Sequence, residues 1–315
     1  MNAPNAPAPS RMTLAAVTRG TLDRPPRVVL YGVEGIGKST FGADAPAPIF
    51  LGAEDGTGHL DVARFPQPRT WADAIDALRT LHGESHEFKT LVVDTVDWLE
   101  PLCWRAVCEA ARKPDIEAFG YGKGYLAALE EWRRFVHGLD ALRAKGMNVV
   151  LLAHALVRPF RNPEGEDYDR YTLKVNEKAA GLLREWADAV LFANYQSFGA
   201  KQQNGRAKNI GTGARTLYTT HRPAADAKNR WSLPDELAMG WGPFADALAE
   251  SRTPARAAAL RAELAAVIEK LCAVAPEVGA KARVACAGAP DSRVAEYLNH
   301  ARARLNEHTP TTTND

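Results

Sequence analysis

The sequence has few cysteines, no excess of either charge and no long apolar segment, and each absence excludes a class of protein. The four cysteines form no C-x-x-C pair and have no histidine at zinc-finger spacing, so neither a zinc finger nor a disulfide scaffold is expected. The formal net charge of the 315 residues is only +1, so any contact with nucleic acid must come from local clusters. No apolar run reaches the length of a membrane span, and the proline-containing start MNAPNAPAPSRM is not a secretory signal. We therefore expect a cytoplasmic protein with reduced thiols and no contact with a membrane.

The composition is that of an ordinary globular protein, with 46% hydrophobic and 24% charged residues. The length allows one sizeable core and a small appendage. After Thr253-Pro254, a cap followed by proline at the first helical position, the sequence is alanine-rich and broken near Pro276 and Pro290. The expected parts are a flexible segment over residues 1–24, an α/β core over 25–248, a small helical domain over 249–307 and a disordered tail over 308–315.

Apolar, mostly β-branched runs alternate with helical patterns, which predicts a twisted, mainly parallel sheet flanked by helices. Thr70 can cap a helix that ends at Gly83, and a longer helix ends at Gly146. Residues 194–230 are rich in Gly, Asn, Gln and basic residues around one more strand at 216–220, so we expect an antiparallel extension with mobile loops. The five predicted parallel strands cover residues 27–31, 48–51, 90–94, 148–153 and 188–193.

The stretch GVEGIGKST follows the first strand and fits G-x-x-x-x-G-K-[ST] completely. Glycines let successive backbone N–H groups face one anion, and the helix that follows adds its positive end. Lys38 can reach the β- and γ-phosphates of a nucleotide, and the Ser39 hydroxyl can bind magnesium. The alternative is a glycine-rich turn without a ligand. Pro46 and Pro48 limit the helix to about two turns. The predicted phosphate cradle consists of Gly32, Val33, Glu34, Gly35, Ile36, Gly37, Lys38, Ser39 and Thr40.

Polar residues follow three of the predicted strands: Glu54 in FLGAEDG, Asp94 in TLVVDTVD and His154 in VVLLAHA. The carboxyl ends of parallel strands form the ligand-binding edge of a sheet. We expect Asp94 to hold magnesium opposite Ser39, and Glu54 to act as a base or to position the attacking water. His154 can contact the γ-phosphate and signal to the loop that follows. The alternatives are a solvated turn carboxylate for Glu54 and an ordinary strand-end residue for His154; for Asp97, a helix cap is preferred over a partner in the site.

These residues, in this order, resemble the RecA-like family of ATPases, and more closely the small phage-encoded RecA-core proteins that act as single-strand annealing recombinases. The resemblance covers about residues 25–235. Its discriminating feature is the glutamate one strand after the P-loop, since AAA+ ATPases place theirs beside the magnesium aspartate, where this chain has Thr95. The family's usual glutamine sensor is replaced by His154.

The resemblance implies a magnesium-dependent ATPase that uses ATP and Mg²⁺, binds single-stranded DNA and promotes annealing or strand pairing in the cytoplasm of a phage host. It also implies a homo-oligomer, either a ring or a filament, with ATP at the subunit interface. A single-strand-binding protein is a further implied partner.

Two segments fall where RecA-like proteins carry their DNA-binding loops, namely residues 113–125 and the segment after His154. Cations hold phosphates and aromatic rings stack on any base, which suits single strands. Aromatic residues beside glycine are equally suited to packing, and four acidic residues dilute the second segment. The expected DNA contacts are Lys123, Tyr125, Arg158, Phe160, Arg161, Arg206 and Lys208.

Residues 201–230 contain seven lysines or arginines against one acid, Asp226, and a solvated loop is the simplest explanation. In RecA-like and hexameric-helicase relatives, basic residues placed like Lys228 and Arg230 reach the neighbour's ATP. The resemblance therefore implies that both act in trans on the transition state.

Two other functions are compatible with the sequence. A helicase loader would use the nucleotide as a conformational switch and would bind a helicase with little annealing activity. A metabolic or signalling P-loop kinase would need a lid and an acceptor site; neither is obvious, although Lys228 and Arg230 could serve in a lid.

Overall fold

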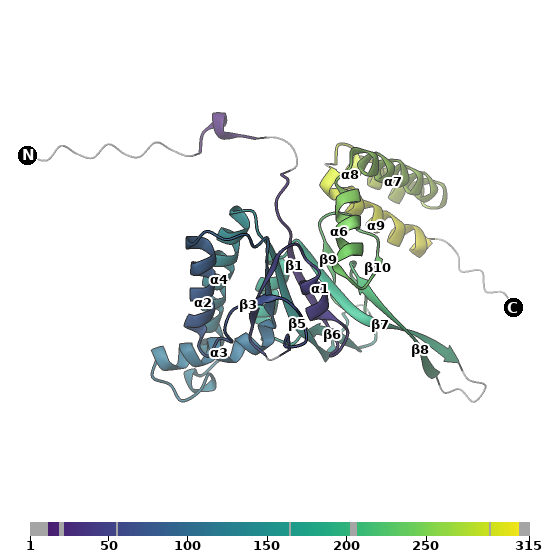
Figure 1. The fold of residues 1–315 in the computed structure, drawn as a ribbon. Coiled ribbons are helices and arrows are strands. Elements are labelled where there is room, and N and C mark those ends of the chain that lie inside the picture. The colour runs from purple at the N-terminus through teal and green to yellow at the C-terminus, as the bar shows by residue number, and fades with distance from the viewer. Residues whose placement is uncertain are drawn as a thin grey trace, which may run out of the picture.

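The computed structural model describes residues 12–18, 22–54, 56–163, 165–201, 207–289 and 291–308. A mainly parallel sheet lies at the centre of this part of the chain, with helices against both of its faces (Figure 1). The helices are η1 (Leu14–Ala16), α1 (Lys38–Ala43), α2 (Trp71–Gly83), α3 (Val96–Ala110), η2 (Glu117–Phe119), α4 (Lys123–Ala144), α5 (Glu177–Trp186), α6 (Trp241–Ser251), α7 (Pro254–Val274), α8 (Pro276–Cys286) and α9 (Asp291–His308). The strands are β1 (Arg27–Gly32), β2 (Pro48–Gly52), β3 (Ala63–Arg64), β4 (Thr90–Asp94), β5 (Asn148–Phe160), β6 (Tyr168–Leu173), β7 (Ala189–Lys201), β8 (Ala207–Tyr218), β9 (Lys228–Asn229) and β10 (Glu236–Ala238).

The strand order β10-β8-β7-β1-β5-β4-β2-β3 places β1, the strand before the P-loop, in the middle of the sheet. β1 pairs in parallel with β5 on one side and with β7 on the other, and β4 pairs in parallel with β5 and β2. The predicted α/β fold with a mainly parallel, helix-flanked sheet is therefore confirmed. β5, which carries His154, separates the P-loop strand from the strand that ends in Asp94.

The alternation of side chains along each strand divides the core into two layers. Val29 and Tyr31 belong to the layer beneath α2, α3, α4 and α5, where the rings of Trp71 and Trp132 meet edge to face at 5.2 Å between centroids. Val28 and Leu30 belong to the opposite layer, which α1 and α6 cover. Thr70 closes the amino end of α2 with a capping box, as the sequence predicts.

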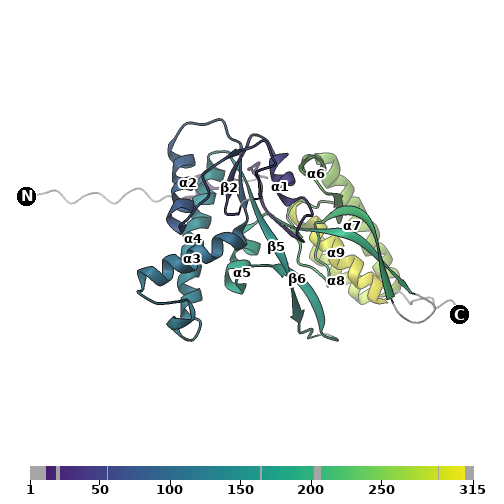
Figure 2. The same cartoon turned by 60° about the horizontal axis from the view of Figure 1, so that its bottom comes forward.

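β5 and β7 both continue beyond the parallel part of the sheet, and each pairs there with an antiparallel strand. β7 pairs with β8, and β8 with β10, so the predicted antiparallel extension is confirmed. β5 was expected to end at residue 153 but continues to Phe160 and pairs with β6. The loop that the resemblance implies after His154 is therefore a hairpin, stabilised by backbone pairing and by the Phe160–Tyr168 ring contact at 5.1 Å. Figure 2 shows this hairpin extending away from the body of the sheet.

The last three helices pack on one another through a core of their own, which includes Leu264, Ile268 and Leu298. The helix before them, α6, instead packs against the sheet through Trp241 and Phe244. The expected division between residues 248 and 249 stays a prediction. Across the described residues, we find no helix with both the length and the apolar character needed to cross a bilayer.

Candidate nucleotide-binding site

The P-loop connects the end of β1 to the start of α1, and glycine is needed at several of its positions. Gly35 and Gly37 have φ angles of 71° and 104°, in the left-handed region that side chains disfavour. At Gly32, a Cβ atom would lie 2.3 Å from the carbonyl oxygen of Ala193 on the neighbouring strand. The loop therefore turns sharply against β7, and α1 behind it has only six residues, as the two prolines predict.

Lys38 points back into this loop. Its Nζ donates hydrogen bonds to the carbonyl oxygens of Gly32 at 3.3 Å and Val33 at 3.0 Å, and the residue is only 7% exposed. Burial lowers the pKa of Lys38, an effect opposed by nearby acids, first of all Asp94. A buried ammonium group inside the loop is what binding of a polyphosphate requires.

Ser39 and Asp94 meet at the carboxyl end of β4. The Ser39 hydroxyl donates to Asp94 Oδ2 at 2.6 Å, and burial raises the pKa of Asp94 against the opposing effects of Ser39 and Lys38. Within the described chain, the other carboxylate oxygen of Asp94 is buried without a hydrogen-bond partner. Mg²⁺ prefers hard oxygen ligands and takes few of them from protein. A free carboxylate oxygen beside a hydroxyl fits that ion, and binding of Mg²⁺ by Ser39 and Asp94 stays a prediction.

Glu54 lies just after β2 and reaches the same site. Burial raises its pKa, and Asp94 and Asp97 raise it further, while His154 and Lys38 lower it. Glu54 is thus near enough to Asp94, His154 and Lys38 to interact with them electrostatically. A carboxylate with a raised pKa is a stronger base, which suits the predicted role of Glu54.

His154 is held by Asp97 from the first turn of α3. Asp97 accepts hydrogen bonds from the His154 backbone N at 2.9 Å and lies 2.8 Å from its Nδ1. Burial acts to raise the pKa of Asp97, but the hydrogen bonds from His154 outweigh it and the pKa is lowered. The preferred helix-cap interpretation of Asp97 is wrong, because Thr95 is the N-cap residue of α3. Asp97 instead holds the imidazole of His154 in place at the edge of the sheet where β1 ends.

A second contact joins α3 to the segment that follows the hairpin. Both carboxylate oxygens of Glu100 accept from the backbone N of Asn176, the N-cap of α5, at 2.9 and 3.0 Å. The backbone N of Lys174 donates to the His154 carbonyl oxygen at 2.9 Å. The sequence analysis missed Glu100; the available signal was an acid on the apolar face of a predicted helix. Burial raises the pKa of Glu100 to about 7.

The Glu100→Gln variant is expected to lose a pH dependence of stability that the parent protein has. Because the pKa of Glu100 is higher in the folded than in the unfolded state, the folded state binds more protons between these values, and stability falls as pH rises toward 8. The loss from pH 5 to 8 is of the order of 3 kcal/mol. Urea denaturation at several pH values measures it, with Glu109→Gln on the exposed face of α3 as control. Equal slopes in all three proteins would contradict the assignment.

The P-loop is contacted from the β7–β8 side by two residues that are direct partners in the ladder between these strands. Tyr195 donates from its hydroxyl to Gly35 O at 3.4 Å, and Arg215 donates from Nη1 to Ile36 O at 3.4 Å. The sequence analysis treated Arg215 only as one member of a basic run. The register that brings it to the loop depends on the pairing of two strands and has no local signal.

Lys228 and Arg230 lie at the opposite, amino-terminal edge of the sheet. Lys228 pairs with Val190 near the start of β7, and its Nζ donates to the carbonyl oxygens of Arg184, Glu185 and Ala187. Arg230 forms an ion pair with Asp188 at 3.2 Å, and this buried carboxylate also pairs with Arg27 and Arg143. These contacts give both residues a structural role within one subunit. Their action on a neighbour's ATP stays a prediction.

The predicted DNA contacts of the first segment lie at the start of α4. Lys123 is the first residue of this helix. The Tyr125 hydroxyl donates to Glu117, and the ring meets Trp104 edge to face at 5.5 Å. Tyr125 is therefore engaged in packing, the alternative that the sequence left open.

The predicted DNA contacts of the second segment lie on the β5–β6 hairpin. Arg158 pairs with the exposed carboxylate of Glu177 at 3.0 Å, and Arg161 is exposed at the end of the hairpin. The ring of Phe160 packs on Tyr168. Lys208 is placed in β8 by its backbone pairing, whereas Arg206 lies outside the described residues.

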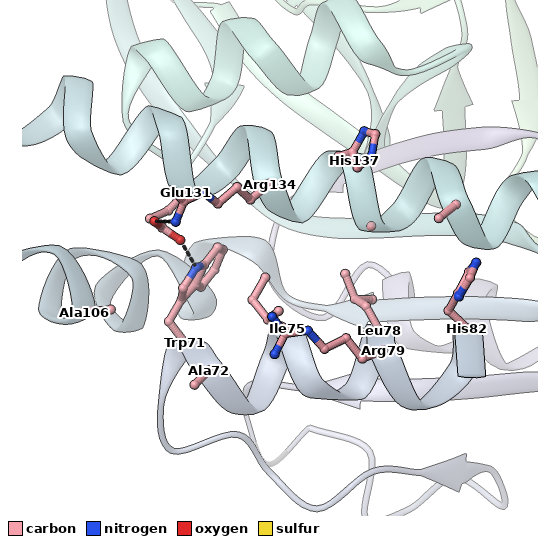
Figure 3. Close-up of a pocket in the computed structure, with 12 residues that line it drawn as sticks. Trp71, Ala72, Ile75, Leu78, Arg79, His82, Ala106, Glu131, Arg134 and His137 are labelled. Carbon is pink, nitrogen blue, oxygen red and sulfur yellow. Dashed lines mark hydrogen bonds and ion pairs between the residues drawn. The ribbon is translucent and has the colours of Figure 1, made fainter. Parts of the chain in front are cut away.

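A groove of about 670 Å³ lies between α2 and α4 (Figure 3). Trp71, Ile75 and Leu78 contribute its apolar wall, and Trp71 Nε1 donates to Glu131 at 3.2 Å. None of the P-loop residues lines it. The nucleotide site is therefore identified by the loop and the strand ends, not by this groove.

A family model described as an AAA domain matches residues 24–231. Among solved structures, the RadB recombinase aligns at 12% identity and a TM-score of 0.38, over 70% of this chain and 90% of that one. A KaiC-like protein from the hyperthermophilic archaeon Pyrococcus horikoshii aligns at 13% identity and a TM-score of 0.33, over 62% and 79%. No curated protein matches the chain. The family match covers the P-loop and every strand except β10, and it ends before α6.

Proposed function

The chain belongs to the AAA domain family, and we propose that this P-loop ATPase is a RecA-like recombination protein that binds single-stranded DNA and promotes annealing or strand pairing in a phage. Its partners under this proposal are single-stranded DNA, further copies of itself in a ring or filament, and a single-strand-binding protein.

Each residue of the site has a separate role in ATP hydrolysis under this proposal. The P-loop and Lys38 bind the β- and γ-phosphates, and Ser39 with the free oxygen of Asp94 would hold Mg²⁺, which neutralises phosphate charge when bound. Glu54 orients and deprotonates the attacking water, since its raised pKa suits a base. His154, oriented by Asp97, contacts the γ-phosphate.

The observation that carries the link to DNA is the continuity of β5. The strand that holds His154 in the nucleotide site runs without a break to Phe160 and forms the hairpin that carries Arg158 and Arg161. A displacement of His154 on phosphate release is therefore passed along one rigid strand to cations and an aromatic ring. Cations and rings of this kind suit a flexible single strand.

An ATPase assay with and without single-stranded DNA, with particle mass measured in the same samples, tests the proposal. We expect DNA to stimulate hydrolysis and to promote assembly. Arg161→Ala should weaken DNA binding and lower its salt dependence without affecting nucleotide binding, while Arg283→Ala on α8 serves as the matched control. Indifference of both rate and mass to DNA would contradict the proposal and favour a helicase loader or a kinase.

Arg230→Ala is expected to impair hydrolysis only in the assembled protein, because under the proposal its cation acts on the neighbour's nucleotide. The expected loss is about a thousandfold or more. Asp188 keeps Arg27 and Arg143 as partners, so the fold should tolerate the change. Mixing this variant with Lys38→Ala should restore some activity across the interface. A loss of the same size in isolated subunits, or no rescue on mixing, would contradict the trans role.

A further inference from the structure

The ribose and base of a nucleotide bound to this P-loop must extend toward β7 and β8. The groups that meet the γ-phosphate and metal, Glu54, Asp94 and His154, come from β2, β4 and β5, all on one side of β1. The ribose and base are at the other end of the triphosphate. Since the cradle fixes the phosphates between these two sides, the base extends toward the strands on the opposite side of β1, β7 and β8.

Tyr195 of β7 and Arg215 of β8 lie on this side of the P-loop. They are direct partners in the antiparallel β7–β8 ladder, so their side chains lie on the same face of the sheet. Tyr195 follows Ala193, the partner of Gly32 where the P-loop begins, by two residues, which places it on the same face as Ala193. Both side chains reach the loop, at Gly35 O and Ile36 O.

The glycine before Lys38 accommodates this contact. A Cβ atom on Gly37 would lie 2.8 Å from Nη1 of Arg215 and 4.0 Å from the terminal methyl group of Met239. The backbone N of Met239 donates to Arg215 O at 3.1 Å, which ties β8 to the segment after β10 at this point. The guanidinium thus lies directly on the outer surface of the loop.

The two side chains also remain available to a ligand. Tyr195 is 41% exposed and Arg215 is exposed, and within the described chain the guanidinium has no carboxylate partner. A guanidinium plane and an aromatic ring both stack on flat heterocycles. An unpaired cation and an exposed ring held side by side on the loop are therefore suited to cover a base.

We propose that Tyr195 and Arg215 form the subsite for the purine base of the nucleotide, with Met239 as its apolar neighbour. The inference rests on the proposed nucleotide site and adds to it the residues that recognise the part of ATP beyond its phosphates. Arg215 keeps its hydrogen bond to Ile36 O while its planar face packs on the base, and the Tyr195 ring packs from the facing strand.

Titrations with two ligands, Mg-ATP and magnesium tripolyphosphate, test this subsite, because only the first has a base. Arg215→Ala and Tyr195→Ala should each weaken ATP binding about tenfold. Neither should change the affinity for tripolyphosphate more than about twofold, since the cradle is untouched. Tyr195→Phe keeps the ring and should bind ATP like the parent, whereas Arg215→Lys keeps the charge but loses the plane and should resemble Arg215→Ala.

Each other outcome overturns the assignment. Equal weakening of both ligands would place Arg215 on the phosphates, as would full rescue by Arg215→Lys. Unchanged ATP binding in both alanine variants would exclude a base contact. If the unmodified protein binds neither ligand, the proposed function itself fails, and the base subsite fails with it.

Discussion

Lys38→Ala is expected to abolish nucleotide binding, with an affinity loss of about a hundredfold or more, the scale of one lost charge-assisted interaction in a buried site. Lys38 is the buried cation of the P-loop, and Glu54, Asp94 and Asp97 all act on it electrostatically. Without the ammonium group, a triphosphate would face these acids with no opposing charge on the loop. Titration of Mg-ATP by calorimetry measures the effect.

The fold itself should survive this substitution. Among the residues that the structure describes, the Lys38 side chain donates hydrogen bonds only to carbonyl oxygens of its own loop, and burial disfavours its charged form. The thermal midpoint of Lys38→Ala should therefore stay within a few degrees of the parent. Lys270→Ala on the exposed surface of α7 is the matched control. Retained ATP binding in the Lys38 variant would remove the basis for the phosphate cradle.

The parts of the fold that the sequence predicted are those with local signals. Glycines at fixed spacing predicted the sharply curved phosphate loop, in which Gly35 and Gly37 have positive φ angles, and apolar runs predicted the parallel strands. Because parallel strands end at a common edge, Glu54, Asp94 and His154 could be assigned to one site before any coordinates were known.

The missed features all depend on contacts between residues far apart in the chain. Glu100 and Asn176 are 76 residues apart, and the His154–Asp97 pair is separated by 57. Arg215 reaches the P-loop only because β8 pairs with β7 in one particular register, and a shift of one residue would turn it to the other face. No local pattern encodes such a register.

The β5–β6 hairpin is a second case in which strand pairing could not be predicted from the local sequence. The resemblance to RecA-like proteins implied a loop after His154, whereas the ladder from Ala155 to Phe160 depends on its match with Tyr168 to Leu173. The consequence is functional as well as structural. A mobile loop would separate His154 from the predicted DNA contacts, but a continuous strand joins them.

Glu54→Gln is expected to retain nucleotide binding and to lose turnover by a factor of about 10² to 10⁴, the usual contribution of a positioned base. The amide has the same shape as the carboxylate, and removal of a negative charge beside the phosphates should leave binding unchanged or make it tighter. The amide cannot accept the proton of the attacking water. Single-turnover hydrolysis and ATP titration on the same samples separate the two effects.

The pH profile distinguishes a base from a residue that only shapes the site. Burial raises the pKa of Glu54, so the fraction of ionised Glu54 falls with decreasing pH earlier than for an exposed glutamate. The parent rate should therefore fall on the acidic side as Glu54 becomes protonated, and the residual rate of Glu54→Gln should lack that limb. Asp61→Asn, in the loop that follows Glu54, is the control and should keep both rate and profile. If Glu54→Gln hydrolyses ATP at the parent rate, the water is activated elsewhere, and the placement of Glu54 beside Asp94 and His154 has another purpose.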